Sequence, residues 1–172
     1  RQSAYFDAED QANPILQYMR KKARHAVTSR LKAGESILEL NAGTGLDATY
    51  FANLGHQVLA TELAPGMFQQ LQQKAAQTAH LSAKNLNFYH INSLKDQRFD
   101  LIFSNFGGLN CIPDPGRVFK QFPELLNPGG YVVLVIMPPF CPWEMSYLLR
   151  GKFQLAFRRF SGKAQAQLEQ EI

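Results

Sequence analysis

Apolar residues near the start of the chain are spaced three or four positions apart, and this spacing predicts a helix. The apolar positions are Ile15, Met19, Ala23, Ala26, Val27 and Leu31. They fall on one side of an α-helix because that helix repeats every 3.6 residues. Asn13 and Pro14 are typical of a helix start, and Gly34 follows the expected end. We therefore expect an amphipathic helix over residues 14–32.

Short continuous apolar runs, separated by Gly, Pro and polar residues, predict buried strands in the rest of the chain. The five predicted strands are residues 36–40, 56–61, 87–91, 99–104 and 131–137. Helical spacing between these runs predicts helices at residues 46–54, 65–80 and 115–126. Gly55 is suited to end the first of these helices in a left-handed conformation, and Pro123 should interrupt the last.

Strands and helices that alternate along a chain form β-α-β units with right-handed crossovers. The sequence therefore predicts an α/β fold of the Rossmann-like, doubly wound kind, with a mainly parallel sheet and helices on both faces. In such sheets, ligands bind beyond the carboxyl ends of the strands, near the place where the strand order reverses. The segments at these ends are residues 39–47, 62–67, 91–95 and 104–111.

Length and composition fit one globular domain. Of the 172 residues, 45% are hydrophobic and 19% are charged, which provides a core and is not typical of a disordered chain. We expect a single domain over residues 1–172, with a helical segment at 1–33, a Rossmann-like core at 36–137 and a C-terminal segment at 138–172. The first residue is not Met, so we expect a trimmed or processed chain.

The longest apolar run, residues 131–137, is followed by two prolines and is much shorter than the roughly 20 residues that cross a bilayer. We therefore expect no transmembrane helix and no secretory leader, and we predict a cytoplasmic protein. Cys111 and Cys141 lie far apart and lack the spacing of a zinc site, so two reduced thiols and no bound metal are expected.

The net charge of +4 is unevenly distributed along the chain. Residues 1–32 carry seven Lys and Arg against three acids, residues 150–172 carry five against two, and the middle of the chain is acidic. A basic patch can meet nucleic acid or an anionic substrate. Because aromatic residues do not interleave with these charges as in a nucleic-acid motif, we interpret them as ordinary solvated helix faces.

The stretch from Ile37 to Gly45, ILELNAGTG, combines an apolar strand, a carboxylate and a glycine turn. Gly43 and Gly45 can adopt positive φ and lack a Cβ atom, so the backbone can lie against a flat ligand. A second carboxylate, Glu62, ends the next strand. In β-α-β nucleotide sites, an acid at this place accepts hydrogen bonds from both ribose hydroxyls. Together these features favour a cofactor that contains adenosine.

Two classes of adenosine cofactor fit this turn. Residues 43–48, GTGLDA, match the GxGxxA pattern of dinucleotide sites, which leaves an NAD(P)-binding oxidoreductase as an alternative. A pyrophosphate brings negative charge to the N-terminus of the helix, where Asp47 and the preceding Glu39 would repel it. S-adenosylmethionine (SAM) has no phosphate but carries a sulfonium and an ammonium group, and these cations suit the two acids.

The ordered set of motifs resembles the class I SAM-dependent methyltransferases. ILELNAGTG resembles their first motif and ATELAPGMF their second, and FDLIFSNFGGLN and ELLNPGGYVVLV are similar to the fourth strand and to the turn before the fifth. The similarity covers roughly residues 37–137 in order and spacing. It implies the class I methyltransferase fold, SAM as cofactor and transfer of a methyl group. The C-terminal strands of the family have no counterpart after residue 137, so residues 138–172, on the acceptor side, are expected to be truncated.

The resemblance also implies which residues contact SAM. Glu39 would hold the methionyl ammonium group, and Glu62 would hold the ribose. The methionyl portion would lie along the backbone of Asn41, Ala42, Gly43, Thr44 and Gly45. The remaining implied contacts are Leu63 and Met67 on the adenine face, Asn92 or Ser93 at its amino group, and Asn105 and Phe106 beside the reactive centre.

Asn41 is a departure from the family, because a glycine usually stands there. Asn tolerates a left-handed backbone angle better than most residues, so such an angle is predicted at this position. The catalytic residue is left unknown, because methyl transfer requires alignment of the reactants more than a nucleophilic side chain. The polar candidates near the strand ends are His90, Asn105, Asn110 and Cys111.

The sequences NPPY and DPPY mark family members that methylate amino groups of nucleic acid or of protein glutamine. Here SNFGGLN stands in their place, so a small-molecule acceptor is expected and a nucleic-acid partner is not. In the N-terminal segment, Arg20 could meet the carboxylate of SAM. A catalytically inactive SAM-fold module that binds a partner through its basic ends is a further alternative, and the oligomeric state is left open.

Overall fold

The computed structural model of the protein describes residues 3–138, 151 and 153. The chain divides into two compact units, residues 1–135 and 136–172, and the fold below is that of the first unit. In this described part of the chain, no helix has the length and the apolar character needed to cross a membrane. Most of the predicted C-terminal segment, residues 138–172, lies outside the described residues. The expectations about the C-terminal strands and about Cys141 therefore concern residues that are not described.

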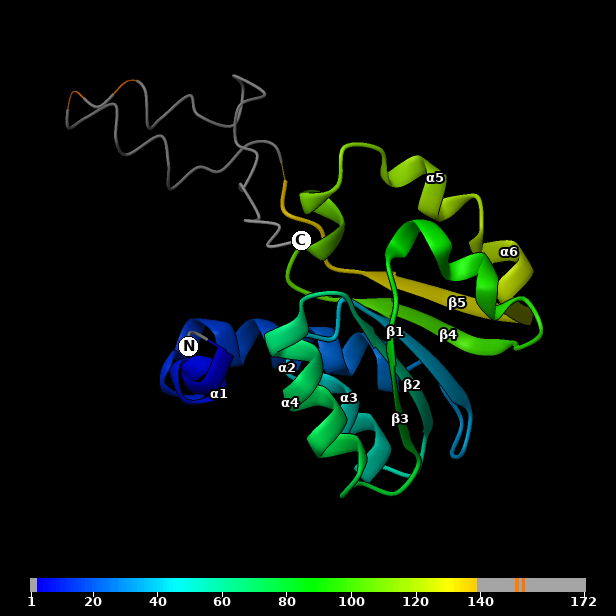
Figure 1. The fold of residues 1–172 in the computed structure, drawn as a ribbon, viewed down its shortest axis with the longest axis horizontal. Coiled ribbons are helices and arrows are strands. Elements are labelled where there is room, and N and C mark those ends of the chain that lie inside the picture. Colours follow the sequence, from blue (N-terminus) through cyan, green and yellow to red (C-terminus); the bar gives the residue numbers. More distant parts are fainter. Residues whose placement is uncertain (1–2, 139–150, 152, 154–172) are drawn as a thin grey trace. The chain divides into compact units, whose positions relative to one another are not determined.

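The first unit is built on a sheet of five parallel strands (Figure 1). The strands are β1 (Ser36–Leu40), β2 (Gln57–Glu62), β3 (Leu81–Asn85), β4 (Phe99–Ser104) and β5 (Leu126–Leu134). Their spatial order is β3-β2-β1-β4-β5, so β1 is central and the order reverses between β1 and β4. The predicted doubly wound α/β fold is confirmed.

Four of the predicted strands are confirmed, with shifted bounds in two of them. β1 and β4 match the prediction, and β2 is displaced by one residue. β5 begins at Leu126 instead of residue 131, because the Pro-Gly-Gly segment that resembles a turn lies within the strand. The pairing of β5 with β4 shifts between Phe99 and Leu101, and Gly129 has a φ of 79°. Such an irregularity inserts residues into one strand without ending it.

The predicted third strand, residues 87–91, is wrong. The strand β3 lies earlier, at Leu81–Asn85, and Phe88–Leu94 forms a 3₁₀-helix, η1. β3 is an edge strand in which the first residue alone is buried, so its sequence shows no apolar run. In η1, the buried residues Ile91 and Leu94 lie three positions apart, as the repeat of a 3₁₀-helix requires. A compact apolar segment was therefore mistaken for a strand.

Helices cover both faces of the sheet (Figure 1). On one face lie α2 (Pro14–Thr28), α3 (Leu46–Asn53) and α4 (Pro65–Ala75), and on the other lie η1, η2 (Gly108–Cys111), α5 (Pro115–Phe119) and α6 (Phe122–Leu125). A further helix, α1 (Ser3–Ala12), precedes α2 within the predicted helical segment 1–33, where no separate helix with these bounds was predicted. The expected arrangement with helices on both faces is confirmed.

Most helix ends follow the predicted signals. Asn13 caps α2, since its Oδ1 accepts hydrogen bonds from the N–H groups of Ile15 and Leu16 at 3.0 and 3.2 Å. Gly55 follows α3 with a φ of 90°, as expected. Pro123 stands in the first turn of α6 and separates it from α5. α4 is shorter than predicted and ends at Ala75.

The core has two apolar clusters, one on each face of the sheet. Side chains alternate between them along β1, where Ile37 packs under α2, α3 and α4 and Leu38 packs on the side of α5 and α6. The rings of Phe51 in α3 and Phe103 in β4 meet edge to face, with centroids 5.5 Å apart. This packing holds the ends of β1 and β4 side by side.

Asp100, near the start of β4, connects three strands. Its Oδ2 accepts hydrogen bonds from the N–H and the hydroxyl of Ser36 in β1, both at 2.8 Å, and its Oδ1 accepts one from the Asn127 amide in β5 at 2.7 Å. Burial by itself would raise the pKa of Asp100. The hydrogen bonds to its ionised form outweigh this effect and hold the pKa below the ordinary 3.8.

We expect Asp100→Ala to lower the free energy of unfolding by about 2 kcal/mol, because the Ser36 and Asn127 donors lose their acceptor. Urea unfolding at neutral pH measures the change. Asp96→Ala removes an exposed carboxylate close by and serves as the matched control, with an expected change below about 0.5 kcal/mol. Equal losses in the two variants would show that Asp100 does not connect the strands as described.

Candidate functional site

The glycine turn after β1 has the backbone conformation that its sequence predicts. Asn41, Gly43 and Gly45 have positive φ values of 50°, 59° and 84°. The left-handed angle expected at Asn41 is thus confirmed. At Gly45, a Cβ atom would lie 2.6 Å from Cδ1 of Leu71 in α4. Both the angle and the close packing therefore require glycine at this position.

The Asn41 side chain joins the end of β1 to the end of β4. Its Nδ2 donates to the carbonyl oxygen of Asn105 at 3.0 Å, and its Oδ1 accepts from the hydroxyl of Ser104. Gly108 lies so close to this side chain that a Cβ atom at Gly108 would overlap with it. A glycine at position 41 could make none of these hydrogen bonds. Asn41 therefore connects the two strands at the point where the strand order reverses.

Glu62, at the end of β2, turns its carboxylate toward the glycine turn. Its Oε2 accepts from the N–H of Gly43 at 2.8 Å, and its Oε1 accepts from the N–H groups of Leu63 and Ala64 at 2.9 and 2.8 Å. A carboxylate has about four acceptor sites, so one site on Oε2 is left for a further donor. One ribose hydroxyl fits this site directly, and a second would have to replace one of the backbone donors.

Glu39 is a buried carboxylate without a full set of partners. It is 2% exposed, and its Oε2 accepts no hydrogen bond from any described residue. Burial raises the pKa of Glu39 well above the ordinary 4.5, and the carboxylates of Asp47 and Glu62 act in the same direction, against Arg20 and Arg24. A buried acceptor without a donor is unfavourable. A ligand that brings an ammonium group therefore fits Glu39.

Four charged side chains beneath the turn form what we call the Asp47 cluster: Asp10, Arg20, Arg24 and Asp47. Arg20 of α2 donates to Asp10 of α1 at 2.7 Å and also to Asp47 at the start of α3. Arg24 donates to the other oxygen of Asp47 at 2.7 Å. Asp10, Arg20 and Asp47 are each at most 5% exposed. Because charges buried this deeply must be paired, the cluster attaches both N-terminal helices to the turn.

The Asp47 cluster corrects two interpretations of the sequence. Two arginines neutralise Asp47, so Asp47 does not present a free negative charge that would repel a pyrophosphate. Arg20, which the sequence offered as one candidate partner for the carboxylate of SAM, uses Nε, Nη1 and Nη2 to bind Asp10 and Asp47. Among the acids near the turn, Glu39 therefore favours a cationic ligand over a pyrophosphate, whereas Glu62 suits the ribose of either cofactor and Asp47 does not discriminate.

Helix α1 also contacts the glycine turn directly. Asp7 accepts hydrogen bonds from the hydroxyl of Thr44 in the turn and from the ammonium group of Lys74 in α4. Thr44 is 1% exposed, so its hydroxyl depends on Asp7 as an acceptor. The sequence of α1 has no clear apolar period, which explains why this part of the site was missed.

Asn105 and Phe106 directly follow β4, where the predicted strand also ends, and both are tightly held. The Asn105 Nδ2 donates to Asp47 at 2.8 Å, and its Oδ1 accepts from the N–H of Phe106 at 2.8 Å. Phe106 has a φ of 49°, and the guanidinium of Arg20 lies 4.6 Å from the centre of its ring. Asn105 therefore holds the loop after β4 in place, and its amide is not free to act on a substrate.

Among the other polar candidates, His90 and Cys111 do not form a catalytic pair in the part of the chain that the structure describes. His90 in η1 and Cys111 in η2 are both exposed. The Cys111 Sγ lies 3.8 Å from the carbonyl oxygen of Gly107. No hydrogen bond between His90 and Cys111 is found in the described part of the chain. The catalytic residue, which the sequence left unknown, is not identified by the geometry either.

Two residues predicted to contact adenine do not have the expected place in the fold, and their contact with a cofactor stays a prediction. Asn92 and Ser93 were expected directly after a strand, but both are exposed residues of η1. Asn85 ends β3 and pairs with Glu62 in the sheet, and its Nδ2 donates to the Glu62 carbonyl oxygen at 2.9 Å. Asn85 was missed because the third strand was placed too late in the chain. Leu63 is half-exposed beside Glu62, and Met67 is partly buried in α4.

Residues 38–134, which are more than half of the chain, match the family described as Methyltransferase domain. The protein therefore belongs to the methyltransferase domain family. Its parallel sheet, with the order β3-β2-β1-β4-β5, is the core of the class I methyltransferase fold.

Individual proteins are similar to this chain over the same region. The demethylmenaquinone methyltransferase of Clavibacter sepedonicus is 30% identical, over 77% of this chain and 56% of its own length. The solved structure of the CcbJ methyltransferase from Streptomyces caelestis is 32% identical with a TM-score of 0.56, over 64% of this chain and 47% of its own. The glycopeptide N-methyltransferase MtfA, solved with SAM, shares the fold at 23% identity and a TM-score of 0.57, over 66% and 53%. The chain spans about half the length of these proteins.

We expect Glu39→Gln to change the pH dependence of stability. The pKa of Glu39 is raised above 4.5 on folding, so the folded state keeps a proton that the unfolded state releases. This stabilising contribution is complete below 4.5 and is lost as the pH rises through the folded pKa. As the pH rises above about 5, the free energy of unfolding of the wild type should therefore fall relative to that of Glu39→Gln, as measured by urea unfolding. Parallel curves for the two proteins would contradict a raised pKa.

Gly108→Ala should destabilise the protein by about 2 kcal/mol, because the new methyl group would overlap with the Asn41 side chain. In an Asn41→Gly background the same substitution should have less than about half that effect, since the obstacle is gone. A double-mutant cycle by urea unfolding measures the difference. If Gly108→Ala were equally destabilising in both backgrounds, the contact between these residues would not be the reason for glycine.

Proposed function

We propose that this protein is a SAM-dependent methyltransferase that acts on a small molecule. The single observation that carries the proposal is a buried carboxylate, Glu39, whose Oε2 has no donor among the described residues, at the turn that Glu62 also contacts. The site thus offers an acceptor for an ammonium group and an acceptor for a sugar hydroxyl. Membership of the methyltransferase domain family and the SAM-bound structural neighbour support the same cofactor.

The residues proposed to hold SAM follow from this arrangement. Glu39 would bind the ammonium group, Glu62 the ribose, and Leu63 and Met67 the adenine face. The backbone of Asn41, Ala42, Gly43, Thr44 and Gly45 would line the methionyl portion, and Asn105 and Phe106 would border the reactive centre. We propose Asn85 at the adenine end in place of Asn92 and Ser93, because Asn85 ends the strand beside Glu62.

When bound, SAM supplies an activated methyl group on a sulfonium, so the protein needs no nucleophile of its own. The task of the chain is to orient the cofactor and exclude water. The ionised form of Glu39 would be stabilised by an ammonium group, which reverses the effect of burial on this carboxylate. The hydrogen bonds of Asn41 and Asn105 fix the loop after β4, where the acceptor would approach.

Several observations support a small acceptor. The relative from Clavibacter sepedonicus is named for demethylmenaquinone and MtfA for a glycopeptide, and neither name refers to a nucleic acid. The SNFGGLN segment after β4 replaces the NPPY-type sequence of enzymes that methylate nucleic acid. A cytoplasmic location and the absence of a nucleic-acid partner stay predictions from the sequence. The NAD(P)-binding oxidoreductase and the inactive module gain no support from the family or from the relatives.

Isothermal titration calorimetry with S-adenosylhomocysteine, the product of SAM, tests the proposal. We expect a dissociation constant in the micromolar range for the wild type, and Glu62→Ala should weaken binding by about 10-fold or more, as for loss of a hydrogen bond to a charged group. Glu62→Gln keeps an acceptor at the same place and should weaken binding less. Glu124→Gln, an exposed acid of α6, is the matched control and should bind as the wild type does.

Two results would contradict the proposal. One is a folded wild-type protein that does not bind S-adenosylhomocysteine. The other is saturable binding of NADH that an excess of S-adenosylhomocysteine does not displace, which would indicate a dinucleotide site instead. Circular dichroism of each variant confirms that a loss of binding is not a loss of folding, since Glu62 also accepts backbone hydrogen bonds.

A further inference from the structure

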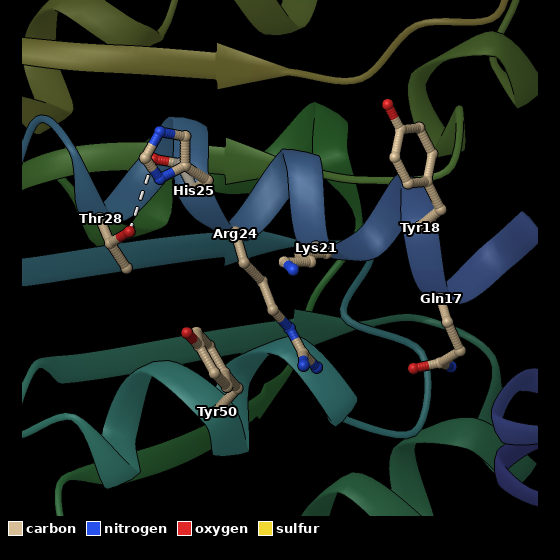
Figure 2. Close-up of a pocket in the computed structure, with 7 residues that line it drawn as sticks. All are labelled: Gln17, Tyr18, Lys21, Arg24, His25, Thr28 and Tyr50. Atoms are coloured by element: carbon tan, nitrogen blue, oxygen red, sulfur yellow. Dashed lines mark hydrogen bonds between the residues drawn. The ribbon is translucent and has the colours of Figure 1, made fainter. Parts of the chain in front are cut away.

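A cavity lies on the outer face of α2, beside the start of α3 (Figure 2). Its volume is about 470 Å³, and it is lined by one face of α2 and by Tyr50 of α3. Figure 2 shows the Arg24 side chain reaching from α2 toward α3, with Tyr50 on one side and Lys21 close by. A cavity of this size can hold a small organic molecule.

The charged groups that line this cavity are cations. Lys21 and Arg24 line it beside the imidazole of His25, no Asp or Glu does, and Arg24 is paired with Asp47 behind it. Lys21 is exposed and makes no ion pair or hydrogen bond within the described part of the chain. Arg24 and His25 lie three and four positions after Lys21 on one helix, so both are neighbours of Lys21 on the same side. The cavity therefore attracts an anion, and Lys21 has all three of its N–H donors available.

The Arg24 guanidinium is held in a fixed orientation at the base of the cavity. Its Nε donates to Asp47 at 2.7 Å, and its Nη2 donates to the carbonyl oxygen of Leu46 at 2.9 Å. The central carbon of the guanidinium, Cζ, lies 4.2 Å from the centre of the Tyr50 ring. A cation that is already oriented loses little conformational freedom when an anion binds. Tyr50, which is 37% exposed, adds a flat apolar surface beside that cation.

We propose that this cavity binds a small molecule that carries a phosphate group next to a flat apolar part. A phosphate has three terminal oxygens, which suits donors from Lys21, Arg24 and His25 better than the two oxygens of a carboxylate do. The aromatic rings of Tyr18 and Tyr50 provide contact area for the apolar part. This site is separate from the residues proposed to hold SAM and does not depend on that proposal.

The sequence does not reveal this site, because its parts come from two helices. The basic residues of α2 were interpreted as a solvated face without aromatic neighbours. In the structure, α3 places Tyr50 against Arg24, although the two residues are far apart in the sequence. An aromatic and cationic surface is thus formed by the packing of α2 on α3.

The experiment is a titration of the ¹⁵N-labelled protein with phenyl phosphate, followed by NMR. We expect saturable shifts confined to amides of α2 and of α3 near Tyr50, and binding about 10-fold weaker in Lys21→Glu. Lys84→Glu makes the same change of net charge on β3, outside the cavity, and should bind within about 2-fold of the wild type. Phenol and benzoate serve as probes without a phosphate, and both should bind at least several-fold more weakly.

Each other outcome overturns a stated part of the proposal. Equal weakening in Lys21→Glu and Lys84→Glu would show a general attraction of anions and no site. If inorganic phosphate bound as tightly as phenyl phosphate, the site would not recognise a flat apolar part of the ligand. A ten-nucleotide single strand of DNA that binds far more tightly than phenyl phosphate, and depends on Lys21, would assign the surface to nucleic acid. An absence of saturable shifts up to about 10 mM phenyl phosphate would refute the site altogether.

Discussion

The rest of the site depends on the ion pairs that the buried carboxylate of Asp47 makes with two arginines. Water cannot reach it, so the protein must supply cations, and it does so with Arg20 and Arg24 from α2. Asn105 adds a hydrogen bond from the end of β4. Removing one partner from a buried pair of this kind usually costs about 3–5 kcal/mol, because a charge is left without compensation. The glycine turn, the N-terminal helices and the loop after β4 are thus positioned together by one carboxylate.

The two acids at the ends of β1 and β2 have opposite environments, and this difference suits two parts of one ligand. Glu39 is buried and its Oε2 has no donor among the residues that the structure describes, so burial favours its neutral form until a cation arrives. Glu62 already accepts three backbone hydrogen bonds, which fix the direction of its carboxylate. A preorganised acceptor of this kind is suited to recognise a neutral sugar hydroxyl, whereas the buried acid is suited to recognise charge.

The parts of the fold that the sequence predicts well are those with a strong local signal. The apolar runs of β1 and β4, the cap of α2 at Asn13 and the positive φ at Asn41 all follow from residue type. Edge strand β3 was missed because little of it is buried. The segment that forms η1 was taken for a strand because Phe88, Tyr89 and Ile91 make a short apolar run. The partners of Asp47 could not be predicted, since an ion pair between distant residues leaves no periodic pattern.

The attachment of α1 has a consequence for the order in which the chain assembles during its synthesis. Asp7 binds Thr44, 37 positions later, and Lys74, 67 positions later. On a ribosome α1 therefore emerges before the residues that it contacts. Helix α1 therefore reaches its final position only after α4 has been made, although it precedes α4 by more than fifty residues.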